Sequence, residues 1–391
     1  MARLPILAWE AISALGAGRE ALLAGLQAGR CALTHDSGQP FDTPCPVGVV
    51  RDELEALPAG AEAFDDRCHR LAWACLSRLE EPIERVKRAY GPERVAVVAA
   101  TSASGFRELE TMFVPGGAPP GFDYQNLVSF GCVARLVRQV SGVNGPAFTD
   151  STACSSGANA FISAAGLLRA GICDAAIVGG AEALCATTYA GFRSLRVVDG
   201  EPCRPFDQER KGMSLGEGAA FFVLEREPGE LGGDSPFLAG VGASLDAHHM
   251  TAPDPDGTGS ELAMRAALDD AGLEPGGIGY INLHGTGTPL NDASEAASVA
   301  RLFGRDVSCS STKGGAGHLL GAASAFEIAI SLAVLETGLL PANVNLQTAD
   351  PELGISPLAE ARQVDPPGFV MSNSFGFGGN NTAVVLGRAA R

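Results

Sequence analysis

Charged residues are scarce in this sequence, and basic residues are the scarcer kind. Of its 391 residues 19% are charged, with 28 Lys and Arg against 45 Asp and Glu, so the formal net charge is -17. A charged share of roughly 25% is usual. The acidic balance excludes a protein whose whole surface binds nucleic acid. The hydrophobic share of 46% excludes intrinsic disorder, because it suffices for a buried core.

Signals for a membrane, for secretion or for a metal are also absent. The long uncharged stretches 151–168 and 366–387 are rich in small or polar residues, unlike the run of about 20 apolar residues that a spanning helix needs. The N-terminus lacks the basic and apolar regions of a signal peptide. The ten cysteines are scattered, with no C-x-x-C pair and no zinc-type His/Cys spacing. We therefore expect a cytoplasmic protein with reduced thiols and no metal.

What the sequence does contain is an alternation of apolar, β-branched runs with helical stretches. It predicts strands at 95–101, 175–180, 219–225, 280–285 and 382–387. It predicts helices at 155–170, 259–272, 292–303 and 318–338. This alternation is typical of an α/β protein with mostly parallel, buried strands.

A weak internal repeat suggests that the chain consists of two similar halves. Residues 97–113 resemble 281–303, and residues 149–171 resemble 310–338. The connection near 226–240 is rich in Gly, Pro and charge, as a linker is. We expect an N-terminal half at 1–230 and a C-terminal half at 231–391.

Cys154 is the candidate nucleophile. It follows a predicted strand end and precedes a helix of small residues, in the segment TDSTACSSGANAF (149–161). At a helix N-terminus the dipole and the free N–H groups favour the thiolate, which is the attacking species in covalent catalysis. The backbone N–H of Cys154 can also serve an oxyanion. The alternative is a buried structural cysteine.

Two histidines and a lysine form the other candidates. His284 ends a predicted strand and opens the turn HGTGT, while Lys313 and His318 lie on the glycine-rich turn before a helix. Strand ends of this kind carry the functional groups of α/β proteins. The alternatives are a packed histidine and a solvated lysine. Glu327, within the apolar helix, is expected to be a buried, partnered carboxylate. The patterns of nucleotide-binding loops are absent.

Together and in this order, the motifs resemble those of the β-ketoacyl-acyl carrier protein synthases. The motifs are Cys154 in T-A-C-S-S-G, His284 in H-G-T-G-T, Lys313 and His318 in K-x-x-x-G-H, and the loop G-F-G-G at 376–379. The resemblance covers most of the chain. It implies a thiolase-like fold of two βαβαβαββ halves, stacked in five layers (α-β-α-β-α) and usually dimeric.

The resemblance also implies roles for these residues. Cys154 would take an acyl group from an acyl carrier protein, and malonyl carrier protein would then lose CO₂ and attack it. His284 and His318 would stabilise the enolate. Lys313 would act electrostatically on the surroundings of the second histidine, and Glu327 would order the network behind it. The N–H groups of Cys154 and Phe377 would form an oxyanion hole, and Phe377 would gate the acyl chain.

Further assignments follow from the same resemblance. Thr286, Thr288, Phe192 and Phe375 would bind substrate, and Arg196, Arg67 and Arg70 would dock the acidic carrier protein. No cofactor is implied, since the substrates arrive on the carrier's phosphopantetheine arm. The partner subunit would be an identical chain or a homologous chain-length-factor-like subunit.

Departures from the pattern leave the pathway open. The first strand reads PILAWEAISALG without Thr-Gly, Asn380 stands where Thr or Ser is usual, and GGAPPGFDYQN (116–126) lacks basic residues. Fatty acid elongation and a specialised polyketide or polyene pathway are both compatible with this sequence. A Cys–His thioesterase is the alternative activity.

Overall fold

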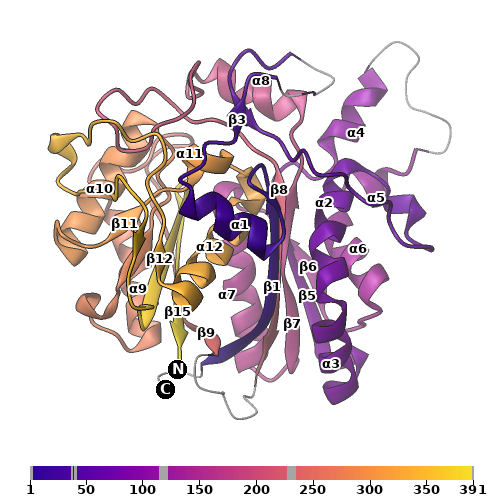
Figure 1. Cartoon of the computed structure of the whole chain (residues 1–391). Coiled ribbons are helices and arrows are strands. Elements are labelled where there is room, and N and C mark those ends of the chain that lie inside the picture. The colour runs from indigo at the N-terminus through magenta and orange to yellow at the C-terminus, as the bar shows by residue number, and fades with distance from the viewer. Residues whose placement is uncertain (1–2, 37, 39–41, 114–121, 227–234, 390–391) are drawn as a thin grey trace.

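One large β-sheet runs through the computed structural model of the chain (Figure 1). The structure describes residues 3–36, 38, 42–113, 122–226 and 235–389. The sheet has 11 strands in the order β11-β10-β14-β15-β9-β1-β8-β7-β5-β6, with β2 paired to β1. Their bounds are β1 Leu4–Ser13, β2 Gly16–Ala17, β5 Val95–Ala100, β6 Ala147–Asp150, β7 Ala175–Glu182, β8 Gly218–Glu225, β9 Pro236–Leu245, β10 Tyr280–Asn282, β11 Cys309–Ser310, β14 Phe369–Gly376 and β15 Asn380–Arg388. Two small sheets pair β3 (Leu33–Thr34) with β4 (Val47–Gly48) and β12 (Leu339–Leu340) with β13 (Arg362–Gln363).

The two ends of this sheet have the same topology. The N-terminal strands β1, β5, β6, β7 and β8 and the C-terminal strands β9, β10, β11, β14 and β15 both lie in the order third, second, fourth, fifth, first. In both, the second strand is parallel to the third and fourth, and the fifth is antiparallel to the fourth and first. The halves join where β1 pairs with β9. The predicted linker falls mainly on 227–234, outside the described residues, so the boundary at 230 stays a prediction.

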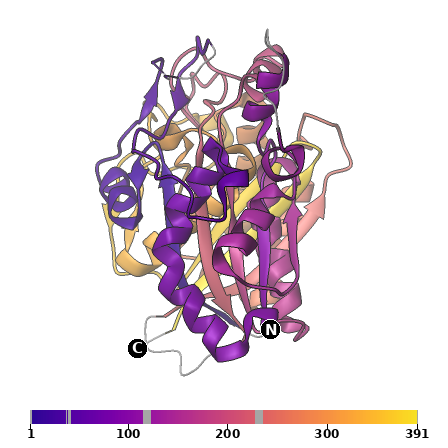
Figure 2. The same cartoon turned by 90° about the vertical axis from the view of Figure 1, so that its right-hand side faces the viewer.

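Helices complete five layers, α-β-α-β-α, as Figures 1 and 2 show. The central layer consists of α7 (Ser156–Arg169) and α12 (Ala323–Thr337), and it lies between the two halves of the sheet. The N-terminal half is covered outside by α2 (Arg67–Leu76), α3 (Glu80–Tyr90) and α6 (Cys132–Ser141), and the C-terminal half by α9 (Thr258–Ala271) and α10 (Pro289–Phe303). The shorter helices are α1 (Arg19–Gln27), α4 (Phe106–Glu110), α5 (Tyr124–Leu127), α8 (Ala186–Ser194) and α11 (Lys313–Ala316).

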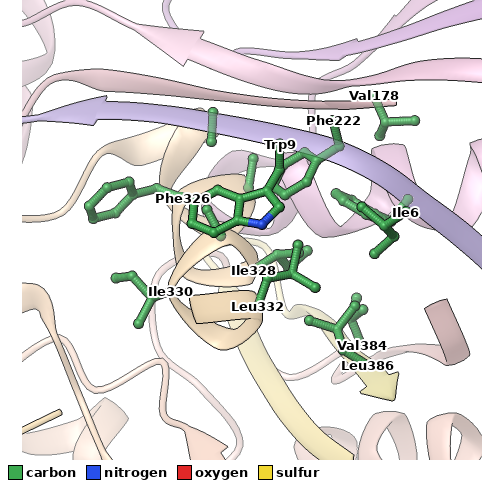
Figure 3. Packing of buried hydrophobic residues seen from close by; sticks show 14 of the residues in the cluster. Ile6, Trp9, Val178, Phe222, Phe326, Ile328, Ile330, Leu332, Val384 and Leu386 are labelled. Atoms are coloured by element: carbon green, nitrogen blue, oxygen red, sulfur yellow. The ribbon is translucent and has the colours of Figure 1, made fainter. Parts of the chain in front are cut away.

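The apolar runs of the sequence fold as strands because both of their faces are buried. Successive side chains of a strand point to opposite faces. In β8, Phe222 and Leu224 join the central cluster with α7 and α12, and Phe221 and Val223 join the outer cluster with α2 and α6. Figure 3 shows the central cluster, where Trp9 of β1 lies among side chains of β8 and α12.

The predicted elements are confirmed, with ends that differ by a few residues, but the predicted strand direction is wrong. The sheet is mixed: its parallel pairs are β5–β6, β5–β7, β10–β11 and β10–β14, and its other pairs are antiparallel. In the C-terminal half the reason is a tight turn, since only residues 377–379 separate β14 from β15. So short a connection produces an antiparallel pair.

One helical segment, Leu320–Thr337, is long and apolar enough to cross a membrane. It is 89% buried inside the protein, because α12 lies between the two halves of the sheet. Among the described residues α12 is therefore a helix of the protein core.

Candidate active site

The cysteine and the two histidines that the sequence singled out meet at one cavity. The cavity has a volume of about 230 Å³, and Cys154, His284 and His318 are among its lining residues. One ring nitrogen of each histidine and the Cys154 Sγ lie within 4.8 Å of one another. The N-terminal half therefore supplies the sulfur of this site and the C-terminal half supplies the imidazoles.

Cys154 lies in the short 3-10 turn Ala153–Ser155 that leads directly into α7. Ala153 has a φ of 53°, a conformation that few non-glycine residues adopt. The Oγ of Ser156 donates to the carbonyl of Ala153 at 2.5 Å, and the N–H of Thr152 donates to the same Oγ at 2.9 Å. These bonds hold the sulfur at the N-terminus of α7, as predicted.

The expected thiolate is wrong for the resting protein. Burial raises the pKa of Cys154 to about 11, although Lys313 and the N–H groups of Phe377 and Cys154 lower it. Removal of the sulfur from water outweighs these favourable contacts, because a charged group loses its hydration inside a protein. The resting residue is a neutral thiol beside groups that stabilise its anion.

The glycine-rich loop after β14 lies against the nucleophile. A side chain at Gly376 would approach the carbonyl of Thr152 to 3.1 Å and the nitrogen of Cys154 to 3.3 Å. The N–H groups of Phe377 and Cys154 both face the sulfur. An oxyanion hole needs two converging backbone donors, and the expected role of these two N–H groups stays a prediction.

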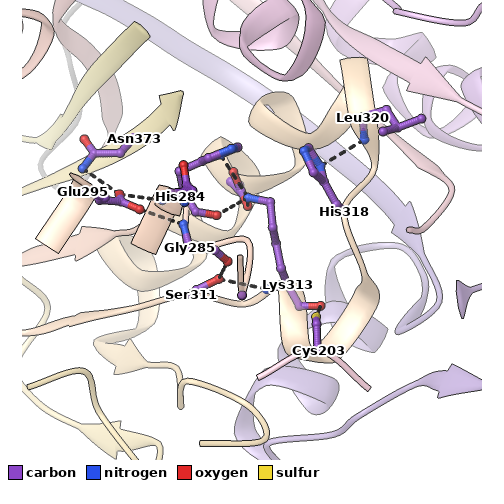
Figure 4. Close-up of polar contacts among 12 residues, drawn as sticks. Cys203, His284, Gly285, Glu295, Ser311, Lys313, His318, Leu320 and Asn373 are labelled. Carbon is purple, nitrogen blue, oxygen red and sulfur yellow. Dashed lines mark hydrogen bonds and ion pairs between the residues drawn. The ribbon is translucent and has the colours of Figure 1, made fainter. Parts of the chain in front are cut away.

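His284 lies just beyond the end of β10, and a buried carboxylate holds its backbone. Glu295 of α10 accepts the N–H groups of His284 and Gly285, both at 2.8 Å (Figure 4). The ring of His284 lies 5.5 Å from that of His318, at an angle of 84° between their planes.

Lys313 contacts the first histidine and not the second. Its Nζ donates to the carbonyl oxygen of His284 and lies 3.3 Å from His284 Nδ1. It also forms an ion pair with Glu327, and both side chains are buried. The expected electrostatic influence of Lys313 on His318 is present, since its charge lowers the pKa of that ring, although the direct contacts of Lys313 are with His284. The expected partner for Glu327 is confirmed.

These contacts assign the same tautomer to both histidines. Leu320 N–H donates to Nδ1 of His318 at 3.2 Å (Figure 4). An ammonium group has no acceptor, so the Lys313 Nζ makes Nδ1 of His284 the acceptor as well. A neutral imidazole with an accepting Nδ1 carries its proton on Nε2. Within the described residues His318 Nε2 has no hydrogen-bond partner.

Both imidazoles are neutral at physiological pH. Burial lowers the pKa of His284 and of His318 well below the usual 6.5, and the charge of Lys313 lowers both further. The site thus presents two neutral N–H donors beside a thiol. Such donors stabilise an oxyanion without supplying a formal charge.

The other predicted substrate residues lie around the same cavity. Thr286, Thr288, Phe375 and Phe377 line it, and the two threonine hydroxyls are 2.9 Å apart. Phe192 is not a lining residue, but its ring lies 5.6 Å from that of Phe377. Phe192 therefore packs near a lining residue and not on the cavity itself.

The three predicted docking arginines do not share one surface. Arg196 lines the cavity, whereas Arg67 donates from Nε to the buried Glu217 at 2.9 Å. Arg70 forms an ion pair with Asp65. Each of these two guanidinium groups is held by a carboxylate of this chain, and their docking role stays a prediction.

Two residues of the site were missed from the sequence. Lys211 lines the same cavity as Arg196, and Glu295 holds the His284 turn. Neither has a local signal that separates it from an ordinary surface lysine or helix carboxylate.

A thiol and two imidazoles are also groups that can ligate zinc. Here Lys313 lies beside His284, and its positive charge opposes a second cation. The expected absence of a metal stays a prediction.

Known proteins match the chain over most of its length. The model of the β-ketoacyl synthase N-terminal domain matches residues 52–229, and that of the C-terminal domain matches residues 237–347. The 3-oxoacyl-[acyl-carrier-protein] synthase 2 of Vibrio cholerae is 36% identical over 75% of this chain and 76% of its own length. The enzyme of the same name from Staphylococcus aureus is 37% identical over 63% of this chain and 64% of its own.

Solved structures agree with these matches. A ketosynthase in complex with its chain length factor from Xenorhabdus doucetiae has a TM-score of 0.90 and 37% identity, over 99% of this chain and 98% of that one. A β-ketoacyl synthase from Burkholderia phymatum has a TM-score of 0.87 and 28% identity, with both chains fully covered at 100%. Neither the relatives nor the site favours the alternative of a thioesterase. The chain belongs to the β-ketoacyl synthases, the acyltransferases that carry out the condensing step of fatty acid and polyketide synthesis.

Proposed function

We propose that Cys154, His284 and His318 carry out a decarboxylative condensation on thioesters of an acyl carrier protein. The observation behind this proposal is the meeting of the Cys154 sulfur with two neutral imidazoles at one cavity. A thioesterase would instead need a base that activates water. With their protons on Nε2, neither imidazole is set up to accept a proton there.

The first half-reaction loads the acyl group onto Cys154. The sulfur attacks the thioester carbon, its proton passes to the departing carrier thiol, and the C–S bond to the carrier breaks. The N–H groups of Cys154 and Phe377 hold the oxyanion, and the Lys313 charge and the α7 N-terminus stabilise the sulfur as its proton leaves. The raised pKa of Cys154 keeps the thiol protected until a substrate is bound.

The second half-reaction uses the histidines. The malonyl thioester oxygen accepts hydrogen bonds from Nε2–H of His284 and of His318, so the electron pair released with CO₂ is held as an enolate. The enolate carbon attacks the acyl carbon on Cys154, the C–S bond breaks, and Cys154 leaves as a thiolate that takes up a proton from water and returns to the resting thiol. The two neutral donors thus bind the charge that forms only as CO₂ leaves. Lys313 and Glu327 position His284, and no cofactor takes part.

Arg196 and Lys211 form the proposed cationic rim, where the carrier protein docks. Both line the cavity that leads to Cys154, and among the described residues neither forms an ion pair. Two unpaired cations at the mouth of a site attract an acidic partner in a chain whose net charge is -17,. Thr286 and Thr288 then contact the phosphopantetheine arm.

A homologous chain-length-factor-like subunit is the proposed partner at the free edge of the sheet. The edge strand β6 (Ala147–Asp150) exposes Phe148, and Phe130 is also exposed. Two similar solved structures, from Xenorhabdus doucetiae at 37% identity and the ishigamide system at 28%, are of a ketosynthase with a chain length factor. This favours a specialised polyketide or polyene pathway. The ten free cysteines suit a cytoplasmic location.

Intact-protein mass spectrometry on single half-reactions tests the activity. With acyl carrier thioesters we expect Cys154 to gain the mass of the acyl group, and with malonyl carrier protein we expect CO₂ release. Release of free acid without CO₂ would contradict condensation and support a thioesterase. Native mass spectrometry of the chain purified alone tests the partner, because a stable homodimer of the 40.0 kDa chain would contradict an obligate heterodimer.

A further inference from the structure

Glu182, the last residue of β7, is fully buried and takes no part in the mechanism above. Its carboxylate accepts the backbone N–H groups of Ser102, Ala103 and Ser104 at 2.7, 2.9 and 3.1 Å. The hydroxyls of Thr101 and Ser102 donate to it at 3.0 and 2.7 Å. Glu182 therefore holds the loop that follows β5.

The same carboxylate reaches the C-terminal half through Gly321. The N–H of Gly321 is 3.0 Å from Glu182 Oε2 and 3.0 Å from Ser102 Oγ. A side chain at position 321 would come within 2.4 Å of the Ser102 nitrogen and 2.7 Å of Glu182. This is a close backbone approach that only glycine permits.

Gly321 is next to the residue that sets the orientation of His318. Leu320 has a φ of 47°, a left-handed conformation that a leucine keeps only where its surroundings enforce it. Its N–H donates to Nδ1 of His318 at 3.2 Å. The Gly321 N–H lies in the peptide plane after Leu320 and the Leu320 N–H lies in the plane before it, so anchoring the Gly321 N–H restricts the φ and ψ of Leu320 that join the two planes and thereby the direction of the donor to His318.

We propose that Glu182 is a positioning residue for His318: it anchors the Gly321 amide, keeps Leu320 left-handed, and so holds the tautomer that aims Nε2–H at the cavity. The proposal rests on the role of His318 as an enolate donor. It gives His318 a carboxylate support from the opposite half of the chain, as Glu295 supports His284 from its own half.

The principal test is Glu182→Gln, which places an NH₂ group among donors and so breaks part of the network. We expect decarboxylation of malonyl carrier protein to fall about 10-fold to 10²-fold, the size of effect that a small misplacement of a catalytic group produces. Acylation of Cys154 should stay within about twofold, because it does not use His318. A parallel loss of both half-reactions together with a lower Tm would overturn the proposal and leave Glu182 a structural residue.

A matched pair of variants keeps the test valid if Glu182→Gln does not fold. Ser102→Ala removes a hydroxyl that touches the Gly321 amide, whereas Thr101→Val removes one that touches only Glu182 and the loop after β5. We expect decarboxylation to fall about 3-fold to 10-fold in Ser102→Ala and to stay unchanged in Thr101→Val. Equal effects in the two variants would contradict the route through Gly321.

The tautomer gives a readout that does not depend on turnover. The chain has 6 His residues, whose ring nitrogens can be labelled with ¹⁵N and observed by NMR. The variant His318→Ala then assigns the signal of His318. The wild-type signal should be that of a pure Nε2–H tautomer, and Ser102→Ala or Glu182→Gln should shift it toward a mixture. An unchanged signal would overturn the proposal. If the wild-type protein releases no CO₂ but the His318 signal shifts in Ser102→Ala or Glu182→Gln, the proposed function fails and the positioning role stands.

Discussion

The loop after the second strand of each half offers a direct comparison. After β10 this loop carries His284, and Glu295 accepts its consecutive N–H groups. After β5 it carries Ser102, and Glu182 accepts consecutive N–H groups in the same way. The loop after β10 carries the proposed catalytic histidine, whereas the loop after β5 and Glu182 contact Gly321 of the opposite half. Similar backbone geometry therefore does not decide which of the two loops carries a reactive side chain.

The turns before the central helices show a second correspondence. The turn before α7 contains Ala153 with a φ of 53°, and the turn before α12 contains Leu320 with a φ of 47°. In both, a strained residue lies within two positions of a catalytic side chain. The first turn exposes a sulfur at a helix N-terminus, and the second exposes an imidazole. The site thus needs both halves at once, and each prediction below separates their contributions.

The largest effect is expected from the nucleophile turn. Cys154→Ala should abolish acyl transfer without unfolding the protein, because alanine fits a helix start of small residues. Cys154→Gln should still release CO₂ from malonyl carrier protein, since its amide imitates the acyl thioester while the histidines are intact. Mass spectrometry and CO₂ release measure the two steps. Transfer that survives in Cys154→Ala would show that another residue is the nucleophile.

The histidine turns should give the next largest effect. His284→Ala and His318→Ala should each reduce decarboxylation about 10²-fold to 10³-fold, as the loss of a preorganised oxyanion donor does. Acylation of Cys154 should suffer less, because the α7 N-terminus belongs to the other half. The ratio of the two single-turnover rates is the measurement. Equal losses in both steps would instead indicate a Cys–His ion pair.

The influence of Lys313, from the C-terminal half, on Cys154, from the N-terminal half, should appear in the pH dependence of Cys154 labelling. Burial raises its pKa to about 11, so the thiolate fraction, and the rate of iodoacetamide labelling, should rise about tenfold per pH unit between pH 7 and 9. Lys313→Met removes a charge that lowers this pKa and should slow labelling at each pH. Rates that are flat across this range would contradict a neutral resting thiol.

The smallest effect is expected at the rim. Arg196→Glu and Lys211→Glu should each raise the KM for carrier-protein thioesters several-fold, about 3-fold to 10-fold, and less so in high salt. A small pantetheine thioester is the control, and its turnover should scarcely change. Equal losses with both substrates would place these cations in the catalytic scaffold.

Arg67→Ala is the counterpart of these rim variants. It should lower the Tm and leave the KM of both substrates unchanged, because it leaves Glu217 buried without its partner,. A raised KM for the carrier thioester alone would restore Arg67 as a docking residue.

Much of the fold was predictable because its signals are local. The apolar runs of β5, β7, β8 and β15 and the helices α7, α9, α10 and α12 were all expected from periodicity. The strand directions were not, because they depend on how distant segments pair. The first strand, β1, carries Trp9 into the central cluster, yet its sequence has no signal of which neighbours it joins.

The sequence by itself determined which residues are candidates for catalysis. A cysteine before a helix of small residues and two histidines at glycine-rich turns are recognisable because each pattern spans only a few positions. The tertiary structure decided how they act. It placed Lys313 beside His284, paired Arg67 with Glu217 across 150 residues, and brought Glu182 to Gly321 across 139 residues. The physical reason is that burial and charge set the pKa of Cys154,, and that hydrogen-bond donors at Nδ1 set the tautomers of the histidines,. Both depend on neighbours that only folding brings together.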